Sequence, residues 1–189
     1  MDVASLPWFD ARAFYGSGGY PPHTTSFSRA FSKIRQKIAN AIRRVNPRRA
    51  LEVGPGDVPM IRYVPDPVYV DLVPEFLRKI DHGRRVVADL RRLPFSDRSC
   101  GLVVVNDVLC HIPAHLGRGL AVSEACRVGN SVIFTFTQHV GGIEGSECQI
   151  EEVIEPMKLA GFHGQYEQIN LKDGKAGWSM ITGSLAYAA

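Results

Sequence analysis

No long hydrophobic run occurs in this sequence of 189 residues. Its apolar stretches, such as residues 101–105 and 131–136, are far shorter than the roughly 20 residues that a membrane-spanning helix needs. The N-terminus also lacks a basic segment followed by an apolar one, which is the pattern of a secretory signal. These absences predict a cytoplasmic protein without a membrane span.

Cysteines are few, and none of them forms a Cys-x-x-Cys pair. The four lie in or beside apolar segments, at Cys100, Cys110, Cys126 and Cys148. A small buried thiol is the commonest role of a cysteine in such a position. We therefore expect no disulfide and no metal site.

Acidic residues are missing between Asp10 and Glu52, whereas arginines and lysines are frequent there. Apolar residues in this stretch recur at three- and four-residue steps and predict the buried stripe of a helix, at Phe27, Phe31, Ile34, Ile38, Ile42 and Val45. Pro47 ends that helix. A second, basic stripe carries Arg29, Lys33 and Lys37, with Arg44 in the last turn. It is either a solvated face or a contact for an anionic partner such as RNA.

The composition predicts one packed domain with an N-terminal extension. Hydrophobic residues make up 45% of the chain and charged residues 22%, as in ordinary globular proteins. Residues 1–25 combine glycine, proline, serine and aromatic residues without periodicity, which favours an extended arm. We place the boundary between the extension, residues 1–47, and the domain, residues 48–189.

Strand and helix patterns alternate through the domain. We expect strands within residues 50–53, 68–70, 85–88, 102–105, 131–136, 164–171 and 178–185. Helices are predicted within residues 74–80, 114–126 and 147–160, and Gly129 and Gly161 stop the last two. This alternation is typical of an α/β fold with a parallel sheet, in which ligands bind at the carboxyl ends of the strands.

Polar residues stand at those carboxyl ends. The first strand contains Glu52 and runs into Gly54-Pro55-Gly56, where glycines permit a sharp turn and leave bare backbone for a ligand. A carboxylate inside an apolar strand is costly unless it accepts hydrogen bonds or faces a cation, so Glu52 suits a ligand with an ammonium group. Asp71 ends the second strand, where a carboxylate can bind both hydroxyls of a ribose. Asp89 ends the third.

In this order, these pieces resemble the class I S-adenosylmethionine-dependent methyltransferases. The matching segments are Glu52-Val-Gly-Pro-Gly56, Val70-Asp71-Leu72, Ala88-Asp89-Leu90 and Leu102-Val-Val-Val-Asn106. The resemblance implies a Rossmann-like, seven-stranded, mostly parallel sheet with an antiparallel last strand and helices on both faces. It also implies S-adenosylmethionine as the cofactor and residues 1–47 as a lid over the cofactor edge.

The same resemblance implies a role for each matched residue. Gly54, Pro55 and Gly56 would pack against the methionine and ribose part of the cofactor. Asp71, with Leu72, would bind the ribose hydroxyls, and Asp89, with the Leu90 backbone, would hold adenine. Asn106 would line the methionine end. No metal enters this expected site.

A further segment resembles a subgroup that includes quinone-biosynthesis methyltransferases and many small-molecule methylases. It comprises Leu93-Pro-Phe-Ser-Asp97 and Val108-Leu-Cys-His-Ile-Pro113. His111 is then a candidate general base, because imidazole titrates near neutral pH, although a histidine that only hydrogen-bonds within the fold fits equally well. The resemblance favours a small-molecule acceptor over RNA.

The sequence also departs from the family pattern. Gly101 replaces the usual acidic residue before the fourth strand, and the proline-containing segment between Gly56 and Asp71 is short, which predicts a first crossover helix reduced to about a turn. These departures keep open a non-catalytic subunit that binds S-adenosylmethionine for a partner. A nicotinamide-dependent oxidoreductase is the weaker alternative, because an apolar residue normally stands at the position of Glu52 and a small one at the position of Pro59.

Overall fold

The computed structural model describes residues 25–56, 59–137, 147–169 and 178–185. It contains a long N-terminal helix and then alternating strands and helices. The helices are α2 (Thr25–Val45), α3 (Pro74–Arg78), α4 (Arg118–Val128) and α5 (Glu151–Leu159), with short 3-10 turns η2 (Leu109–His111) and η3 (Ala114–Leu116). The strands are β1 (Arg49–Val53), β2 (Asp66–Asp71), β3 (Arg84–Val87), β4 (Cys100–Asn106), β5 (Gly129–Thr137), β6 (Phe162–Ile169) and β7 (Trp178–Leu185).

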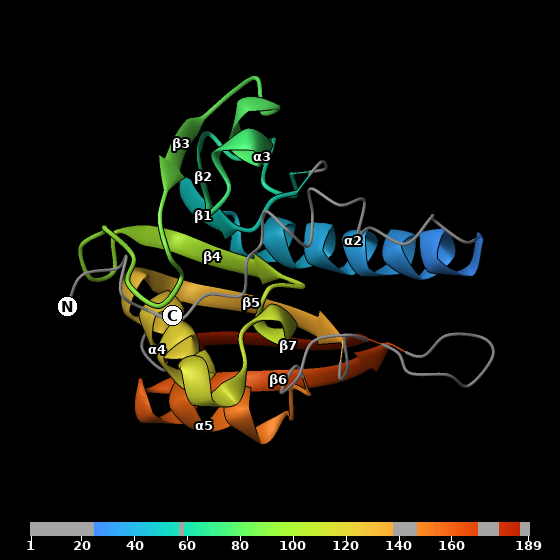
Figure 1. The fold of residues 1–189 in the computed structure, drawn as a ribbon, viewed down its shortest axis with the longest axis vertical. Helices are drawn as coiled ribbons and strands as arrows, with labels where there is room; N and C mark the ends of the chain where they lie inside the picture. The colour runs from blue at the N-terminus through green and yellow to red at the C-terminus, as the bar shows by residue number, and fades with distance from the viewer. Residues whose placement is uncertain (1–24, 57–58, 138–146, 170–177, 186–189) are drawn as a thin grey trace.

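These strands form one seven-stranded sheet in the order β3-β2-β1-β4-β5-β7-β6. The first five in this order run parallel to one another, while β7 is antiparallel to both β5 and β6. The predicted Rossmann-like sheet with an antiparallel last strand is therefore confirmed (Figure 1). Val53 pairs with Val70 on one side and Val105 on the other, so β1, β2 and β4 end at one edge.

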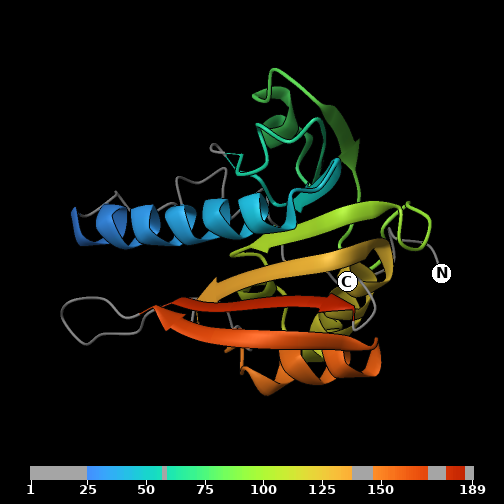
Figure 2. The ribbon, with the colours of Figure 1, turned by 180° about the vertical axis from the view of Figure 1, so that it is seen from behind.

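Helices cover both faces of the sheet (Figures 1 and 2). On one face, Ile34 and Ile38 of α2 pack with Tyr69, Leu102 and Val104. This arrangement follows from the four-residue spacing of the apolar side chains in α2, and burying each of these isoleucines contributes roughly 1.5–3 kcal/mol. The described part of α2 is thus a layer of the packed domain.

The opposite face is covered by α4 and α5. Val122 of α4 and Val153 of α5 belong to one buried cluster with Val103, Val105 and Phe134 of the central strands. Alternate residues of each strand enter opposite clusters because successive side chains of a strand point to opposite faces. Both faces of β4 and β5 are therefore apolar, as buried parallel strands require.

Two connections differ from ordinary crossovers. Residues 59–65, between β1 and β2, form turns and contain no helix, in agreement with the predicted reduction of this crossover. The helix predicted over residues 114–126 is interrupted: Gly117 adopts a left-handed φ of 99° between η3 and α4. A residue with that conformation cannot continue a right-handed helix, so α4 begins only at Arg118.

Two predictions made from the sequence concern residues that the structure describes only in part. The extended arm predicted over residues 1–25 lies almost wholly outside the described residues. Within the described ranges, no helix is both long and apolar enough to cross a membrane.

Candidate cofactor site

A turn with left-handed backbone follows β1 at the carboxyl edge of the sheet. Gly54 has φ 66° and Gly56 has φ 55°, and the Gly54 N–H donates a hydrogen bond to the Val70 carbonyl at 2.8 Å. A Cβ on Gly54 would lie 2.3 Å from Cγ2 of Val108. Pro55 between the glycines is buried. Only glycine therefore combines this backbone conformation with this close packing.

Glu52 lies beneath that turn with none of its surface exposed. Its carboxylate accepts hydrogen bonds from the backbone N–H of Met60, at 2.8 and 3.0 Å, and from that of Ile61, at 3.3 Å. Burial raises the pKa of Glu52 to about 8, against the opposing effect of these hydrogen bonds and of the Arg35 charge. Glu52 thus fastens the end of the glycine-containing segment to β1.

Asp71 is the last residue of β2 and is half-buried. Its Oδ1 accepts a hydrogen bond from the Val73 N–H at 2.9 Å, which fixes the carboxylate at the strand end. Burial raises the pKa of Asp71, and the hydrogen bonds from Val73 and Leu72 oppose that rise. Leu72 itself is exposed beside it.

Asp89 follows β3, and Leu90 next to it is buried too. Arg91, a residue the sequence analysis did not single out, surrounds this carboxylate. Its Nε donates to both oxygens at 2.9 and 3.1 Å, its Nη2 donates at 2.6 Å, and its backbone N–H donates at 2.8 Å. Arg91 Nη1 also donates to the Leu116 carbonyl at 2.9 Å. The carboxylate predicted to face adenine is therefore also the anchor of a buried arginine.

The end of β4 carries Asn106 and Asp107. The Thr135 hydroxyl donates to Asn106 Oδ1 at 2.6 Å. Asp107, which the sequence analysis did not identify, has a left-handed φ of 57° and accepts a hydrogen bond from the Thr137 N–H at 3.2 Å. A non-glycine residue with positive φ is uncommon and often marks a functional site, and aspartate tolerates this conformation better than most residues.

His111 ends η2 and lies close to Asp107. One ligand atom each of Asp107, Cys110 and His111 lies within 4.8 Å of the others. Burial lowers the pKa of His111, while the Asp107 charge opposes the shift, so the neutral imidazole is favoured at pH 7. Burial raises the pKa of the Cys110 thiol well above its usual value, so this thiol stays protonated and donates to Asp107 Oδ1 at 3.4 Å. All four cysteines are buried free thiols, as predicted.

The predicted basic stripe of α2 is only partly exposed. Lys33 and Arg44 face solvent, whereas Lys37 Nζ pairs with the Glu167 carboxylate of β6 at 2.5 Å. The Arg29 side chain lies outside the described residues.

Comparison with known proteins connects this site to one family. The methyltransferase-domain family matches residues 51–132, a range that contains every candidate residue from Glu52 to His111. No curated protein matches the sequence.

Several solved structures share the fold at low sequence identity. Magnesium protoporphyrin IX methyltransferase (ChlM) from Synechocystis PCC 6803, with bound SAH, has a TM-score of 0.73 and 11% identity over 93% of this chain and 98% of that one. A putative sarcosine dimethylglycine methyltransferase from Galdieria sulphuraria has a TM-score of 0.66 and 11% identity over 91% and 96%. The cyclase SpnF has a TM-score of 0.63 and 14% identity over 88% and 84%.

Strand order and family match together define the class of the protein. Residues 51–132 match the methyltransferase domain, and the sheet has the strand order of the Rossmann-like methyltransferase fold. The protein's cofactor is S-adenosylmethionine, and its reaction falls in EC class 2.1.1.

Proposed function

We propose that this enzyme methylates a small-molecule acceptor at the carboxyl edge of its sheet. One observation supports the proposal: the glycine turn after β1 lies at the same edge of the sheet as the polar side chains that end β2 and β4. A small acceptor is supported by two similar structures, whose names specify magnesium protoporphyrin IX and sarcosine or dimethylglycine. The pairing of Lys37 with Glu167 reduces the basic surface that an RNA acceptor would use.

The residues present suit the adenosyl cofactor. The space beside Gly54 and Gly56 would receive its methionine and ribose part, with Pro55 holding the turn. The half-buried Asp71 carboxylate, flanked by Leu72, would accept both ribose hydroxyls. Asn106, at the end of β4, would line the methionine end. This distribution places a hydrogen-bond acceptor for the sugar at the tip of the strand next to the glycine turn.

Two carboxylates of this proposed site already have partners in the fold. We propose that Asp89, with the Leu90 backbone, holds adenine while Arg91 fixes its orientation. Glu52 shapes the turn through the N–H groups of Met60 and Ile61, and its contact with the cofactor's ammonium group remains a prediction.

S-adenosylmethionine supplies an electrophilic methyl group, which is transferred in line to the acceptor and leaves S-adenosylhomocysteine. The main work of the chain is to position both reactants and to exclude water. When the acceptor is a hydroxyl or an activated carbon, His111 accepts the proton that this acceptor releases. The lowered pKa of His111 suits that role, because a neutral imidazole can accept a proton.

We also propose that residues 1–47 contribute the lid and residues 48–189 the catalytic domain. The buried Ile34 and Ile38 anchor α2 on the sheet. On this proposal, α2 is the fixed base of the lid.

The function is tested by following the methyl group. Purified protein is incubated with S-adenosylmethionine labelled in the methyl group and a cell extract, which is then separated into small molecules, RNA and protein. We expect label in the small-molecule fraction. Label in RNA or protein alone would refute a small acceptor. Absence of transfer, together with cofactor binding by calorimetry, would instead indicate a non-catalytic subunit.

A further inference from the structure

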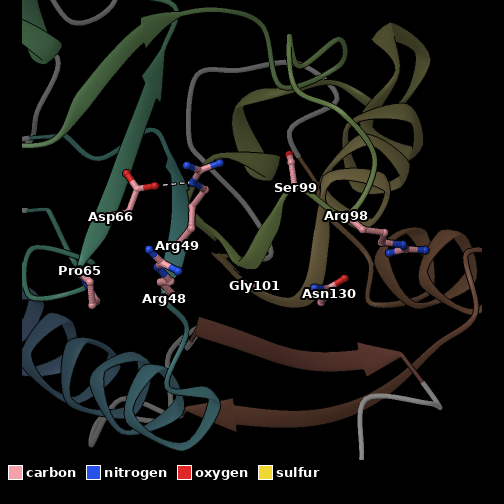
Figure 3. A pocket seen from close by; sticks show the side chains of 8 residues that line it. All are labelled: Arg48, Arg49, Pro65, Asp66, Arg98, Ser99, Gly101 and Asn130. Atoms are coloured by element: carbon pink, nitrogen blue, oxygen red, sulfur yellow. Dashed lines mark hydrogen bonds and ion pairs between the residues drawn. The ribbon is translucent and has the colours of Figure 1, made fainter.

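A pocket lies at the amino edge of the sheet, opposite the proposed cofactor site. Its volume is about 800 Å³, and it is lined where β1, β2 and β4 begin, by Arg48, Arg49, Asp66, Arg98 and Ser99, with Asn130 from β5 (Figure 3). Because β1, β2, β4 and β5 are parallel, this edge is separated from Gly54, Asp71 and Asn106 by the length of the strands. None of its lining residues belongs to the proposed methyl-transfer site.

The lining is positively charged. Three arginines stand against one carboxylate, and that carboxylate is paired: Asp66 accepts a hydrogen bond from Arg49 Nε. Figure 3 shows Arg48 and Arg49 together on one side of the hollow and Arg98 on the other. Arg48 is exposed, and its carbonyl rather than its side chain bonds the Asp66 N–H, at 3.0 Å. Its guanidinium is therefore available for an anion without cost to the sheet.

Arg98 is held in position by the fold. Its Nη1 donates to the carbonyls of Cys126 and Gly129, and its guanidinium carbon lies 5.2 Å from the centre of the Phe162 ring. Figure 3 shows this guanidinium pointing away from Arg48 and Arg49, so Arg98 contributes a fixed positive charge beside the pocket, and Arg48 supplies the available N–H groups. Ser99 and Asn130 add a hydroxyl and a carboxamide to the wall.

Size and charge together indicate the class of ligand. Arginine recognises phosphate through paired N–H groups, and its charge is independent of pH in the physiological range. The volume of about 800 Å³ is within the range of small-molecule pockets and far exceeds one phosphate ion. We propose that this pocket binds a phosphorylated small molecule of nucleotide size, distinct from both cofactor and acceptor.

Calorimetric titration with pyrophosphate, ATP and adenosine tests this proposal. The titrations are made with saturating S-adenosylhomocysteine, so that adenosine groups cannot bind at the cofactor site. We expect pyrophosphate and ATP to bind, adenosine not to bind, and the affinity to fall with added salt. Arg48→Gln should weaken ATP binding roughly tenfold, the usual effect of losing one hydrogen bond to a charged group.

Asp66→Asn tests the sign of the charge. Removing the only carboxylate of the lining should strengthen ATP binding, whereas a site for a cation would lose affinity. Arg78→Gln, at an exposed arginine of α3, is the matched control and should leave ATP binding unchanged.

Three results would overturn the proposal. They are the absence of pyrophosphate and ATP binding, an equal effect of Arg48→Gln and Arg78→Gln, and binding of an RNA oligonucleotide without binding of ATP. S-adenosylhomocysteine binding is measured separately beforehand. If that binding fails, the proposed function is in error. The pyrophosphate titration still tests whether this pocket binds a phosphorylated ligand.

Discussion

The two edges of the parallel strands differ in charge. At the carboxyl edge, β2 ends in Asp71, and Asp89 follows β3. At the amino edge, Arg84 begins β3, Arg49 begins β1 and Arg48 precedes it. Acidic groups thus gather where the glycine turn lies, and basic groups gather behind it. An adenosyl sulfonium with its amine and hydroxyls suits the first edge, and a phosphate suits the second.

The two edges also differ in how far their charged side chains are buried and hydrogen-bonded. Glu52 and Asp89 are buried, and a buried carboxylate is tolerated only when hydrogen bonds compensate for lost hydration. Backbone N–H groups do this only in part for Glu52, since burial still raises its pKa to about 8, and Arg91 does it for Asp89. Arg48 and Arg84 face solvent and need no such support. Substitutions at the carboxyl edge should therefore affect both folding and activity, while those at the amino edge should affect neither strongly.

The largest effect is expected from Gly54→Ala at the carboxyl edge. The new Cβ would lie 2.3 Å from Val108 Cγ2, and the φ of 66° is strained for alanine. We expect loss of measurable S-adenosylhomocysteine binding in calorimetry and a loss of about 1–3 kcal/mol in the free energy of unfolding.

Two further variants show whether the close contact is the cause. Gly119→Ala is the matched control, because its new Cβ would meet its nearest atom, Pro156 Cγ, at an ordinary 3.7 Å. Val108→Ala combined with Gly54→Ala removes the clashing methyl and should restore part of the binding. Normal binding by Gly54→Ala alone would show that the bare turn is not a cofactor contact.

His111→Gln should lower the rate of methyl transfer about a hundredfold while leaving cofactor affinity unchanged, as removal of a general base does. In the parent enzyme, activity should fall when the pH drops through a value below 6.5, because burial lowers the pKa of His111 and protonation removes its lone pair. Label transfer across a pH series measures both effects. An unchanged rate in His111→Gln would show that this histidine has only a structural role.

Asp71→Asn should weaken S-adenosylmethionine binding about tenfold, because a neutral carboxamide accepts ribose hydroxyls less strongly than a carboxylate. The carboxamide oxygen can still accept the hydrogen bond from Val73, so the strand end should persist. Asp81→Asn, at an exposed aspartate, is the control. Equal affinities of the two variants, measured by calorimetry, would contradict the proposed ribose contact.

Strand and helix positions were predictable because both depend on local pattern, whereas the sheet with an antiparallel last strand was expected from the family resemblance alone. Buried apolar runs such as 102–105 and the four-residue spacing of Ile34 and Ile38 define β4 and α2 directly. The break at Gly117 was not predicted, since a glycine within a helical pattern reveals its φ only through tertiary context.

The candidate site was predictable only where a residue stands beside a recognisable turn or strand end. Gly54 and Asp71 are of this kind. Arg91 was missed because its role depends on contacts with both Asp89 and the Leu116 carbonyl, which lies 25 residues away. Asp107 was missed because its left-handed backbone leaves no sign in the sequence beyond the residue type. The amino-edge pocket forms where four strands begin. These strands are distant in the sequence, so no local pattern predicts that their beginnings lie together.

The last effect is one of pH on stability and concerns Glu52, the most deeply buried acid of the carboxyl edge. Its pKa is about 8 in the folded protein against an ordinary 4.5, so between these values the folded state keeps a proton that the unfolded state has released. Raising the pH through this window should therefore destabilise the fold. Relative to Glu52→Gln, which cannot titrate, the parent protein should lose roughly 3 kcal/mol between pH 5 and pH 8. Denaturant unfolding at several pH values measures this difference, and Glu155→Gln, at an exposed glutamate of α5, should track the parent instead. Parallel curves for Glu52→Gln and the parent would mean that Glu52 is ionised throughout, which would favour its predicted contact with the cofactor's ammonium group.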